Sequence, residues 1–250
     1  MNKRDSQILC GLILSKYNEQ GARALGFKNF AEAYNVLGLA LEVPPSTIKN
    51  YRDELDPYFP NGRKGWHQRP LRRHCSDVLE KFGDASLDKL ARLVKSFFDP
   101  NWDLDDVDDD KRGSSEMPLE ESPFAKRLVT GRAAEGFFRL NYRAQEELAS
   151  GTLIDTTLLG CGFDFRINFE GPRDFYAIEV KGMFNDKGGL LLTEKEFHLA
   201  NKLKDRYFLY VVRNFRESPY ASVWRNPLNT EIDWELREEQ ITVSSWRTFI

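Results

Sequence analysis

Apolar residues recur at helical spacing throughout the first hundred positions of the chain. Residues 8–13 and residues 30–41 each place them every three or four positions, which predicts two amphipathic helices. Pro44 and Pro45 then end the second helix, because proline lacks the N–H that a helix interior needs. The same spacing continues over residues 71–97. We therefore expect a small all-α unit at the start of the chain.

Residues 46–55 predict a third helix with a polar outer face. Ser46 is well placed as its N-cap, and Asp56 followed by Pro57 ends it. A helix, a short turn and a second helix of this kind resemble a helix-turn-helix unit, whose second helix enters the major groove of DNA. There Lys and Arg hold phosphate or guanine, and Asn reads adenine. The outward residues are Thr47, Lys49, Asn50 and Arg52.

A basic segment follows this helix. Between residues 61 and 73 the chain carries several Lys and Arg side chains and no acidic one, interleaved with Trp66 and His67. Cations together with an aromatic ring suit contact along a nucleic-acid backbone. The alternative is a small helical unit whose polar face is basic without binding DNA. The cations are Arg63, Lys64, Arg69, Arg72 and Arg73.

The second half of the chain begins with a predicted helix over residues 132–145. Its buried face carries Phe138 and Tyr142, and Glu135 lies along that same face. A glutamate that faces the core is costly unless another group satisfies its charge. Glu135 is therefore a candidate functional residue.

Two neighbouring strands are predicted next, because residues 162–167 and 175–182 both alternate between apolar and polar positions. On one face of the first strand we expect Phe163, Phe165 and Ile167. The opposite face carries Asp164, while Glu179 and Lys181 share one face of the second strand. Adjacent strands would therefore bring these three charged side chains together.

Two carboxylates and one lysine in one place point to metal-assisted chemistry. Neighbouring carboxylates repel each other and favour a cation between them, and Mg²⁺ is commonly held by one or two carboxylates and the phosphate oxygens of a substrate. A lysine beside them can orient a metal-bound water or help to deprotonate it, and can offset charge in a phosphoryl transition state. These parts suffice for hydrolysis of a phosphodiester bond.

A helix and further strands complete the pattern. Thr193 and Glu196 have the spacing of a capping box, which predicts a helix that runs to about Lys204. Strand-like stretches follow at residues 206–212, 221–224 and 241–246.

Charge is unevenly distributed along the chain. Residues 1–98 hold 16 Lys and Arg against 11 Asp and Glu, residues 99–122 hold 2 against 10, and residues 123–250 hold 18 of each. The middle stretch is also poor in apolar residues and contains Gly, Ser and Pro, which favours a solvated linker. A calcium loop is the alternative, but its Gly and closing Glu are not at the required offsets. We expect a helical DNA-binding domain, an acidic linker and a second domain with these boundaries.

Composition excludes several other classes. Cys10, Cys75 and Cys161 lie far apart in the sequence, which disfavours a zinc ribbon or a disulfide framework and fits reduced thiols. The three histidines lack the spacing of a histidine metal site. The longest apolar run, residues 8–14, is too short to span a bilayer, and no signal-peptide pattern surrounds it. We therefore expect a cytoplasmic protein that does not enter a membrane.

The order of the charged residues resembles a known family. Asp164, a gap of 14 residues, and then Glu179-Val180-Lys181 is similar to the signature of the PD-(D/E)XK nuclease superfamily, which has the restriction-endonuclease-like fold. Residues 124–228 also look like the domain at the C-terminus of the plant protein NO VEIN. The similar segments are residues 130–135, 162–165, 179–182, 192–194 and 206–210. One departure is Gly162-Phe163, where many members of the superfamily carry a proline.

That resemblance implies a fold, a cofactor and residue roles. The fold would be α+β or α/β, with a restriction-endonuclease-like αβββαβ domain behind the all-α domain. Asp164, Glu179 and the Val180 carbonyl would bind Mg²⁺, with Mn²⁺ as a substitute. Lys181 would act on the nucleophilic water, and Glu135 would complete the site. The alternative is that the E-x-K tripeptide forms only a surface ion pair worth under about 1 kcal/mol.

These observations lead to one preferred function and two alternatives. The preferred function is a Mg²⁺-dependent endonuclease of the restriction or phage-defence kind that hydrolyses double-stranded DNA. One active site cuts one strand, so we expect a homodimer. One alternative is a DNA-binding regulator with a degenerate nuclease fold and no catalysis. The other alternative is a ribonuclease.

Overall fold

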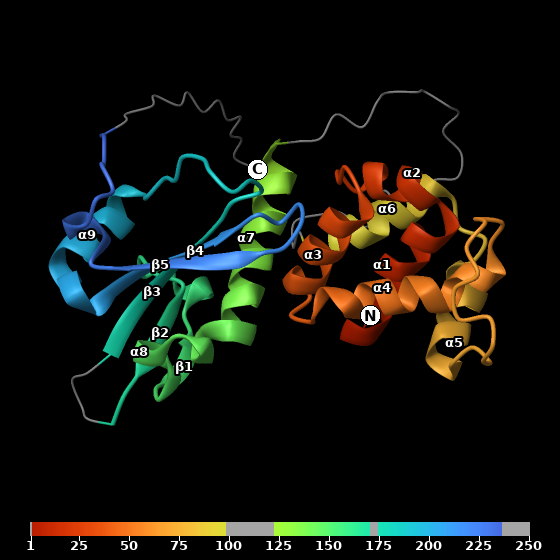
Figure 1. The fold of residues 1–250 in the computed structure, drawn as a ribbon, viewed down its shortest axis with the longest axis horizontal. Helices are drawn as coiled ribbons and strands as arrows, with labels where there is room; N and C mark the ends of the chain where they lie inside the picture. Colours follow the sequence, from red (N-terminus) through yellow and green to blue (C-terminus); the bar gives the residue numbers. More distant parts are fainter. Residues whose placement is uncertain (1, 99–122, 171–174, 237–250) are drawn as a thin grey trace, which may run out of the picture.

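The chain folds into a helical part and a part built on one β-sheet (Figure 1). The computed structural model describes residues 2–98, 123–170 and 175–236, and for residues 123–128 it describes the backbone alone. The predicted linker over residues 99–122 and the strand expected at 241–246 lie outside these described residues. The division into two domains around that linker therefore stays a prediction.

The helical part confirms the expectation of an all-α unit at the start of the chain. Its helices are α1 (Lys3–Lys16), α2 (Asn18–Ala24), α3 (Phe30–Ala40), α4 (Pro45–Leu55), α5 (Arg73–Phe82) and α6 (Leu87–Ser96). Helix α1 lies at its centre and is buried continuously from Ser6 to Ser15. Gly11 allows α4 to cross it closely, because a Cβ at this position would lie 2.7 Å from the Cβ of Tyr51.

Helix α4 begins two residues earlier than its sequence predicts. Pro44 occupies the N-cap position and Pro45 the first helical position, so the expectation that Ser46 caps this helix is wrong. Proline is well suited to the first turn, where its missing N–H would have no partner in the helix anyway. The end of the helix at Leu55 is as expected, and a short 3₁₀ turn from Asp56 to Tyr58 follows.

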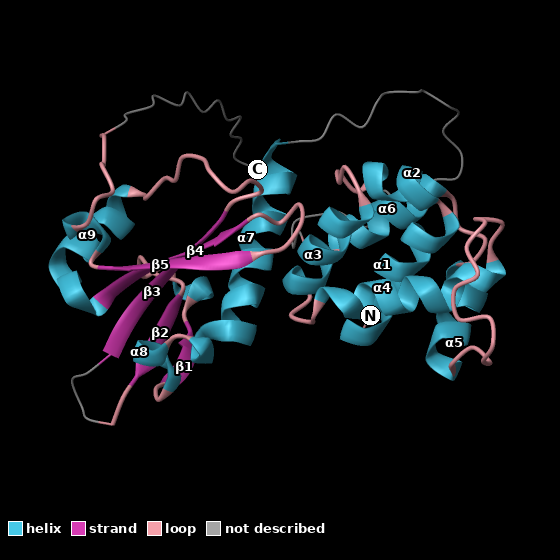
Figure 2. Cartoon of the chain, in the orientation of Figure 1, coloured by secondary structure: helices cyan, strands magenta, loops and turns pink. Residues whose placement is uncertain are grey.

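The second part is a five-stranded sheet with helices on both faces, which confirms a mixed α and β fold (Figure 2). In chain order it contains α7 (Pro123–Asn141), α8 (Glu146–Ala149), β1 (Thr152–Asp155), β2 (Phe165–Asn168), β3 (Phe175–Gly182), α9 (Glu194–Leu203), β4 (Tyr207–Arg213) and β5 (Tyr220–Arg225). The strands lie in the order β1-β2-β3-β4-β5, and β3 with β4 is the one parallel pair. Helix α7 starts nine residues before the predicted Arg132, which corrects that boundary.

Alternate residues of the strands bury two separate apolar layers. Helix α7 covers one face, where the ring of Phe138 lies 4.8 Å from that of Phe165 and 4.9 Å from that of Tyr210 between centroids. Helix α9 covers the opposite face, where Ala200 packs with Ala177 and Tyr207. The odd-numbered residues of β3, which include both charged candidates, therefore lie on the α9 face.

The two parts contact each other through α3 and α7, and one apolar core runs across this contact (Figure 1). The helices approach so closely at Gly136 that a Cβ there would lie 1.8 Å from the carbonyl oxygen of Leu39. Asn35 of α3 donates from Nδ2 to the carbonyl oxygens of Phe215 and Glu217, at 2.9 and 3.0 Å. Within the described segments, no helix is long and apolar enough to cross a membrane.

Candidate active site

The site lies where β2 and β3 diverge. The pairing of these strands ends with Phe165 opposite Ile178, and the backbone N–H of Asp164 still donates to the Ile178 carbonyl at 3.0 Å. Beyond that point the Asp164 side chain takes over as hydrogen-bond acceptor for β3, because its Oδ2 accepts the backbone N–H of Val180 at 2.8 Å. The carboxylate of Asp164 is therefore fixed against β3.

The divergence has a local cause in the sequence. Gly162 adopts a φ of +95°, a conformation that residues with a side chain rarely adopt, and the chain bends before β2 begins. As a result Phe163 packs with Ala177 and Tyr207 on the α9 face. The expectation that Phe163 shares a face with Phe165 is wrong, because strict alternation applies only where the chain is extended.

Strand β3 places Glu179 and Lys181 side by side on the α9 face. Glu179 is 3% exposed, in the middle of the sheet. The Nζ of Lys181 lies 2.6 Å from Oε1 of Glu179. A buried carboxylate of this kind requires a cation or a proton to offset the loss of hydration.

Glu196 of α9 is a further member of the site that the sequence did not reveal. Its Oε2 accepts from Nζ of Lys181 at 2.8 Å and from the backbone N–H of Thr193 at 2.9 Å. The expected capping box of Thr193 and Glu196 is confirmed. From its spacing, Glu196 is predicted only as the capping-box partner of Thr193. No signal in the sequence connects it with Lys181.

Glu135 enters the site from α7. Its Oε2 lies 3.8 Å from Nη2 of Arg139, and the same nitrogen lies 2.6 Å from Oδ2 of Asp155 on β1. Burial, and then the charge of Asp164, raise the pKa of Glu135 to about 7, although Arg139 acts in the opposite direction. The charge of Asp164 therefore reaches Glu135 and disfavours its ionisation.

The remaining charges of the site are strongly coupled. Burial, followed by the charge of Asp164, raises the pKa of Glu179 to about 9. Burial also raises the pKa of Asp164, against the hydrogen bond from Val180. Burial would lower the pKa of Lys181, but Glu179 and Glu196 outweigh it and raise that pKa, so the ammonium stays charged at neutral pH. Lys181 thus carries one positive charge between the two carboxylates of Glu179 and Glu196.

The chemistry of these groups fits a hard divalent cation. The side-chain atoms that could bind a metal here are carboxylate oxygens, which Mg²⁺ prefers as ligands. Mg²⁺ needs only one or two of them because it retains several waters. Among the described residues, no three His, Cys, Asp or Glu side chains are already arranged around a metal position. Asp164, Glu179 and the Val180 carbonyl are the groups that would hold Mg²⁺.

The expected DNA-binding residues of α4 have different environments. Lys49 and Asn50 are exposed, and Thr47 is half-buried. Arg52 is directed inward instead: its side chain is 13% exposed, forms an ion pair with Asp53, and lies over the Phe30 ring at 5.2 Å. Helix α4 therefore presents fewer polar groups to a ligand than its sequence predicts.

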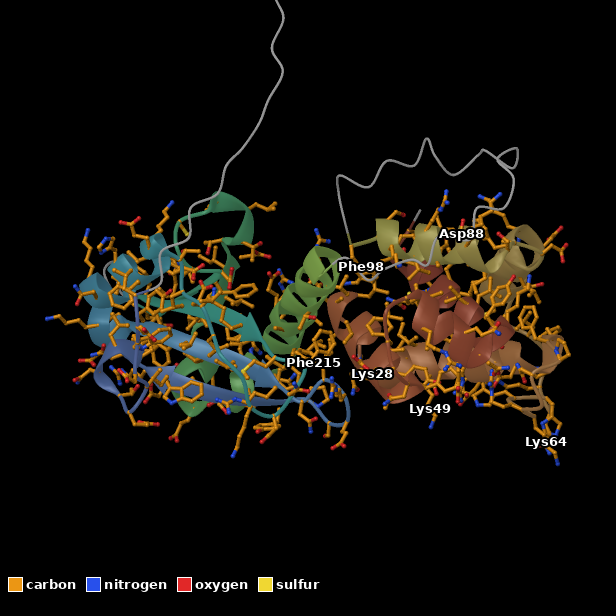
Figure 3. The ribbon with its side chains drawn as sticks, turned by 90° about the horizontal axis from the view of Figure 1, so that it is seen from above. Lys28, Lys49, Lys64, Asp88, Phe98 and Phe215 are labelled. Carbon is orange, nitrogen blue, oxygen red and sulfur yellow. The ribbon has the colours of Figure 1, made fainter. Side chains whose placement is uncertain are left out.

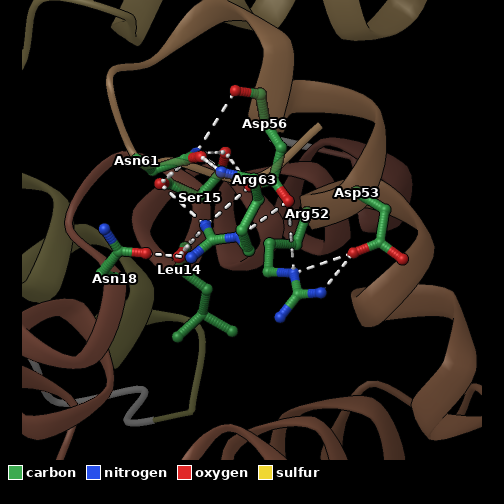
Figure 4. Close-up of polar contacts among 8 residues, drawn as sticks. All are labelled: Leu14, Ser15, Asn18, Arg52, Asp53, Asp56, Asn61 and Arg63. Carbon is green, nitrogen blue, oxygen red and sulfur yellow. Dashed lines mark hydrogen bonds and ion pairs between the residues drawn. The ribbon is translucent and has the colours of Figure 1, made fainter. Parts of the chain in front are cut away.

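The basic segment after α4 is also partly internal. Arg63 donates to the carboxylate of Asp56 (Figure 4). Arg72 donates to the carboxylate of Glu54. Exposed positions are occupied by Lys64, Arg69, Arg72 and Arg73, although Arg72 also pairs with the buried Glu54. Lys49 and Lys64 point to the same side of the helical part, opposite Asp88 (Figure 3).

Comparison with known proteins connects the sheet with one family. Residues 135–224 match the family model described as Protein NO VEIN, C-terminal. The matched segment begins at Glu135 and contains Asp164, Glu179, Lys181 and Glu196. Neither the curated proteins nor the solved structures gave a match.

Proposed function

We propose that this protein is a Mg²⁺-dependent endonuclease that hydrolyses phosphodiester bonds of double-stranded DNA. The observation that carries the proposal is the junction of β2 and β3. There Asp164 is fixed by the N–H of Val180 at 2.8 Å, and Lys181 lies 2.6 Å from Glu179. Two carboxylates and one ammonium group held together at this junction provide the groups needed for attack of water on a phosphate diester.

Each residue has a defined task in this proposal. Bound Mg²⁺ would supply Lewis acidity and a water of lowered pKa. Asp164 and Glu179 hold the charge that attracts it, and the N–H of Val180 keeps Asp164 in place. Lys181 carries its positive charge toward the non-bridging oxygens, where negative charge develops.

Glu135 completes the set from the α7 side. In this proposal it is the helix carboxylate whose pKa is raised by burial and then by the charge of Asp164. Water would attack in line with the departing 3′ oxygen and leave a 5′ phosphate. The superfamily assignment to the PD-(D/E)XK nucleases, the restriction or defence role and the homodimer all belong to this proposal. The order of the charged residues and their convergence at the β2–β3 junction support the nuclease assignment.

The test is cleavage of supercoiled plasmid, with methylated and unmethylated DNA as parallel substrates. We expect nicked or linear product with Mg²⁺ or Mn²⁺ and none with EDTA. Asp164→Asn, Glu179→Gln and Lys181→Ala should each abolish the product. Lys28→Ala is the matched control, because Lys28 is an exposed lysine of the helical part and is not a member of the β2–β3 junction.

The same experiment distinguishes the other functions. Binding of plasmid without nicking under every condition would favour the DNA-binding regulator and contradict the nuclease. Cleavage of RNA in place of DNA would move the proposal to a ribonuclease. Equal cleavage by the wild-type protein and Lys181→Ala would show that a contaminating nuclease was responsible.

A further inference from the structure

The loop over residues 59–72 is held rigidly against α4, and we call it the 59–72 loop. Its centre is Gly65, with a φ of +49°, where a Cβ would lie 2.2 Å from the carbonyl oxygen of Asp53. The following N–H, that of Trp66, donates to that same oxygen at 2.8 Å. Only glycine allows this close contact, so the loop has one conformation at its centre.

A buried polar network fixes the first half of the 59–72 loop (Figure 4). Asp56, 1% exposed, accepts from Ser15 Oγ at 2.8 Å, from Asn61 Nδ2 at 3.0 Å and from Arg63 Nη2 at 2.7 Å. Arg63 also donates to Asn18, and Asn61 to the carbonyl of Ser15 at 3.1 Å. Arg63 is therefore a structural residue of the loop.

The second half is fixed at Glu54, which is 2% exposed. The backbone N–H and the Nε of Arg72 both donate to its Oε1 at 3.0 Å. The Nη2 of Arg69 lies 3.7 Å from Oε2 of the same carboxylate. Each half of the loop therefore forms hydrogen bonds with a buried carboxylate at the end of α4, the first half with Asp56 and the second half with Glu54.

The tip of the 59–72 loop, in contrast, is open and chemically rich. The guanidinium of Arg69 lies 3.8 Å from the centroid of the Trp66 ring, which is a stacking distance. Together with Gly65, His67 and Gln68 these residues line an open cavity of ≈ 460 Å³. Stacking holds the guanidinium in one plane, so its in-plane N–H donors have a fixed direction.

We propose that the tip of the 59–72 loop, and not helix α4, reads base edges of double-stranded DNA, with Arg69 binding guanine. The inference rests on the proposed function, because it assigns base recognition within that DNA-binding protein. Arginine binds O6 and N7 of guanine through two parallel hydrogen bonds, and glutamine reads adenine. A loop that is already ordered loses little conformational entropy on binding. Helix α4, whose Arg52 is turned inward, offers fewer such groups.

The test selects bound duplexes from a random pool, with the Lys181→Ala protein in EDTA so that nothing is cut. We expect an enriched sequence that contains guanine. Trp66→Ala and Arg69→Lys should abolish the enrichment and weaken binding of the selected duplex by about tenfold to about a hundredfold. Arg69→Lys keeps the charge and leaves Arg72, the hydrogen-bond partner of Glu54, in place. A wild-type denaturation curve for this variant shows that the loss of enrichment does not come from unfolding.

Two controls define the result that would overturn the inference. Arg73→Lys makes the same chemical change at a neighbouring exposed arginine and should leave the enrichment unchanged. Lys49→Ala with Asn50→Ala should also leave it unchanged. Loss of enrichment in this α4 variant, with retention in the loop variants, would assign reading to α4 and refute the proposal.

Other outcomes are equally decisive. If Arg69→Lys weakens binding equally for every sequence, with a smaller salt dependence, Arg69 binds phosphate and the base contact is refuted. A protein that enriches sequences through the loop but cuts no DNA would refute the proposed nuclease and retain this inference. If the protein cuts DNA and the loop variants have no effect on enrichment, the proposed nuclease is retained and this inference is refuted.

Discussion

Lys181 and Glu196 form a direct bridge between strand β3 and helix α9, with Nζ and Oε2 2.8 Å apart. The same oxygen accepts the N–H of Thr193, so the capping box that begins α9 also fixes the position of the lysine. Because Lys181 contacts Glu179 on its other side, the ammonium is held between two carboxylates. This geometry makes Glu196 a positioning residue for Lys181.

Replacement of Glu196 should therefore impair cleavage without unfolding α9. In Glu196→Gln the amide oxygen can still accept the N–H of Thr193, but the charged bond to Lys181 is lost. We expect cleavage to slow by about tenfold, which corresponds to about 1.4 kcal/mol. The measurement is the rate of plasmid nicking at saturating Mg²⁺.

Glu194→Gln is the control for that change. Glu194 lies in the same first turn of α9, but its side chain is 91% exposed and its one ion-pair contact is His198, at 3.5 Å. It should cleave at the wild-type rate. Equal effects of the two substitutions would contradict a positioning role for Glu196.

The buried acids should make the metal-free protein less stable as pH rises. The pKa of Glu179 is raised from 4.5 to about 9 and that of Glu135 from 4.5 to about 7. Between the ordinary and the raised values the folded protein binds more protons than the unfolded chain, so the free energy of unfolding falls with increasing pH. Thermal denaturation in EDTA should show a falling Tm over this range.

Glu179→Gln should flatten that dependence, because it removes the larger of the two shifts. Mg²⁺ should raise the Tm of the wild-type protein most at alkaline pH. There the carboxylates have lost their protons, and the metal neutralises them instead. A Tm that rises with pH over the same range, or a Glu179→Gln protein with the wild-type slope, would show that these acids do not control stability.

The contact between the two parts depends on the absence of a side chain at Gly136. Because a Cβ there would lie 1.8 Å from the Leu39 carbonyl, Gly136→Ala must separate α7 from α3. We expect a loss of about 3 kcal/mol in the free energy of unfolding, at the upper end for overpacking. The measurement is denaturation by urea.

Gly131→Ala provides the matched control on the same helix. A Cβ at Gly131 meets no atom within 4 Å, so this change should leave stability unchanged or raise it by about 0.5–1 kcal/mol through helix propensity. If both substitutions destabilise equally, the close approach of α3 and α7 does not hold the parts together.

Substitutions of the neighbouring residues Arg63 and Lys64 should affect different properties, stability in the first case and DNA binding in the second. Arg63→Gln leaves the buried carboxylate of Asp56 without its principal ion-pair partner, so we expect a loss of about 3 kcal/mol in stability. Lys64→Gln changes an exposed side chain and should cost less than about 0.5 kcal/mol, while it weakens DNA binding in low salt. Denaturation curves and binding isotherms for both variants check this; a stable Arg63→Gln protein would contradict the role of the network.

Much of this architecture follows from local patterns in the sequence. The helical periodicity located α1, α3 and α4, and alternation located β3. The convergence of Glu179 and Lys181 follows directly from the two-residue period of a strand. The segment that became β1 went unnoticed, because three of its four residues are exposed and it has no apolar alternation.

The remainder depends on contacts between residues distant in the sequence. Helical spacing cannot show that Arg52 turns toward Asp53 and Phe30, or that Arg63 pairs with Asp56, because a basic residue looks the same whether it binds DNA or another part of the chain. Similarly, Glu196 satisfies a complete local rule as a capping residue. Its contact with Lys181 arises only when α9 packs across the sheet.

The most direct test of the account is the position of a divalent cation. Mn²⁺ can be located by its anomalous scattering in crystals of the protein grown with the metal. The account predicts a peak within coordination distance of Asp164 and Glu179, lost in the Glu179→Gln variant. A peak elsewhere would contradict a metal-dependent catalytic site at this junction. So would the absence of a peak in crystals where the Lys181–Glu179 ion pair is intact.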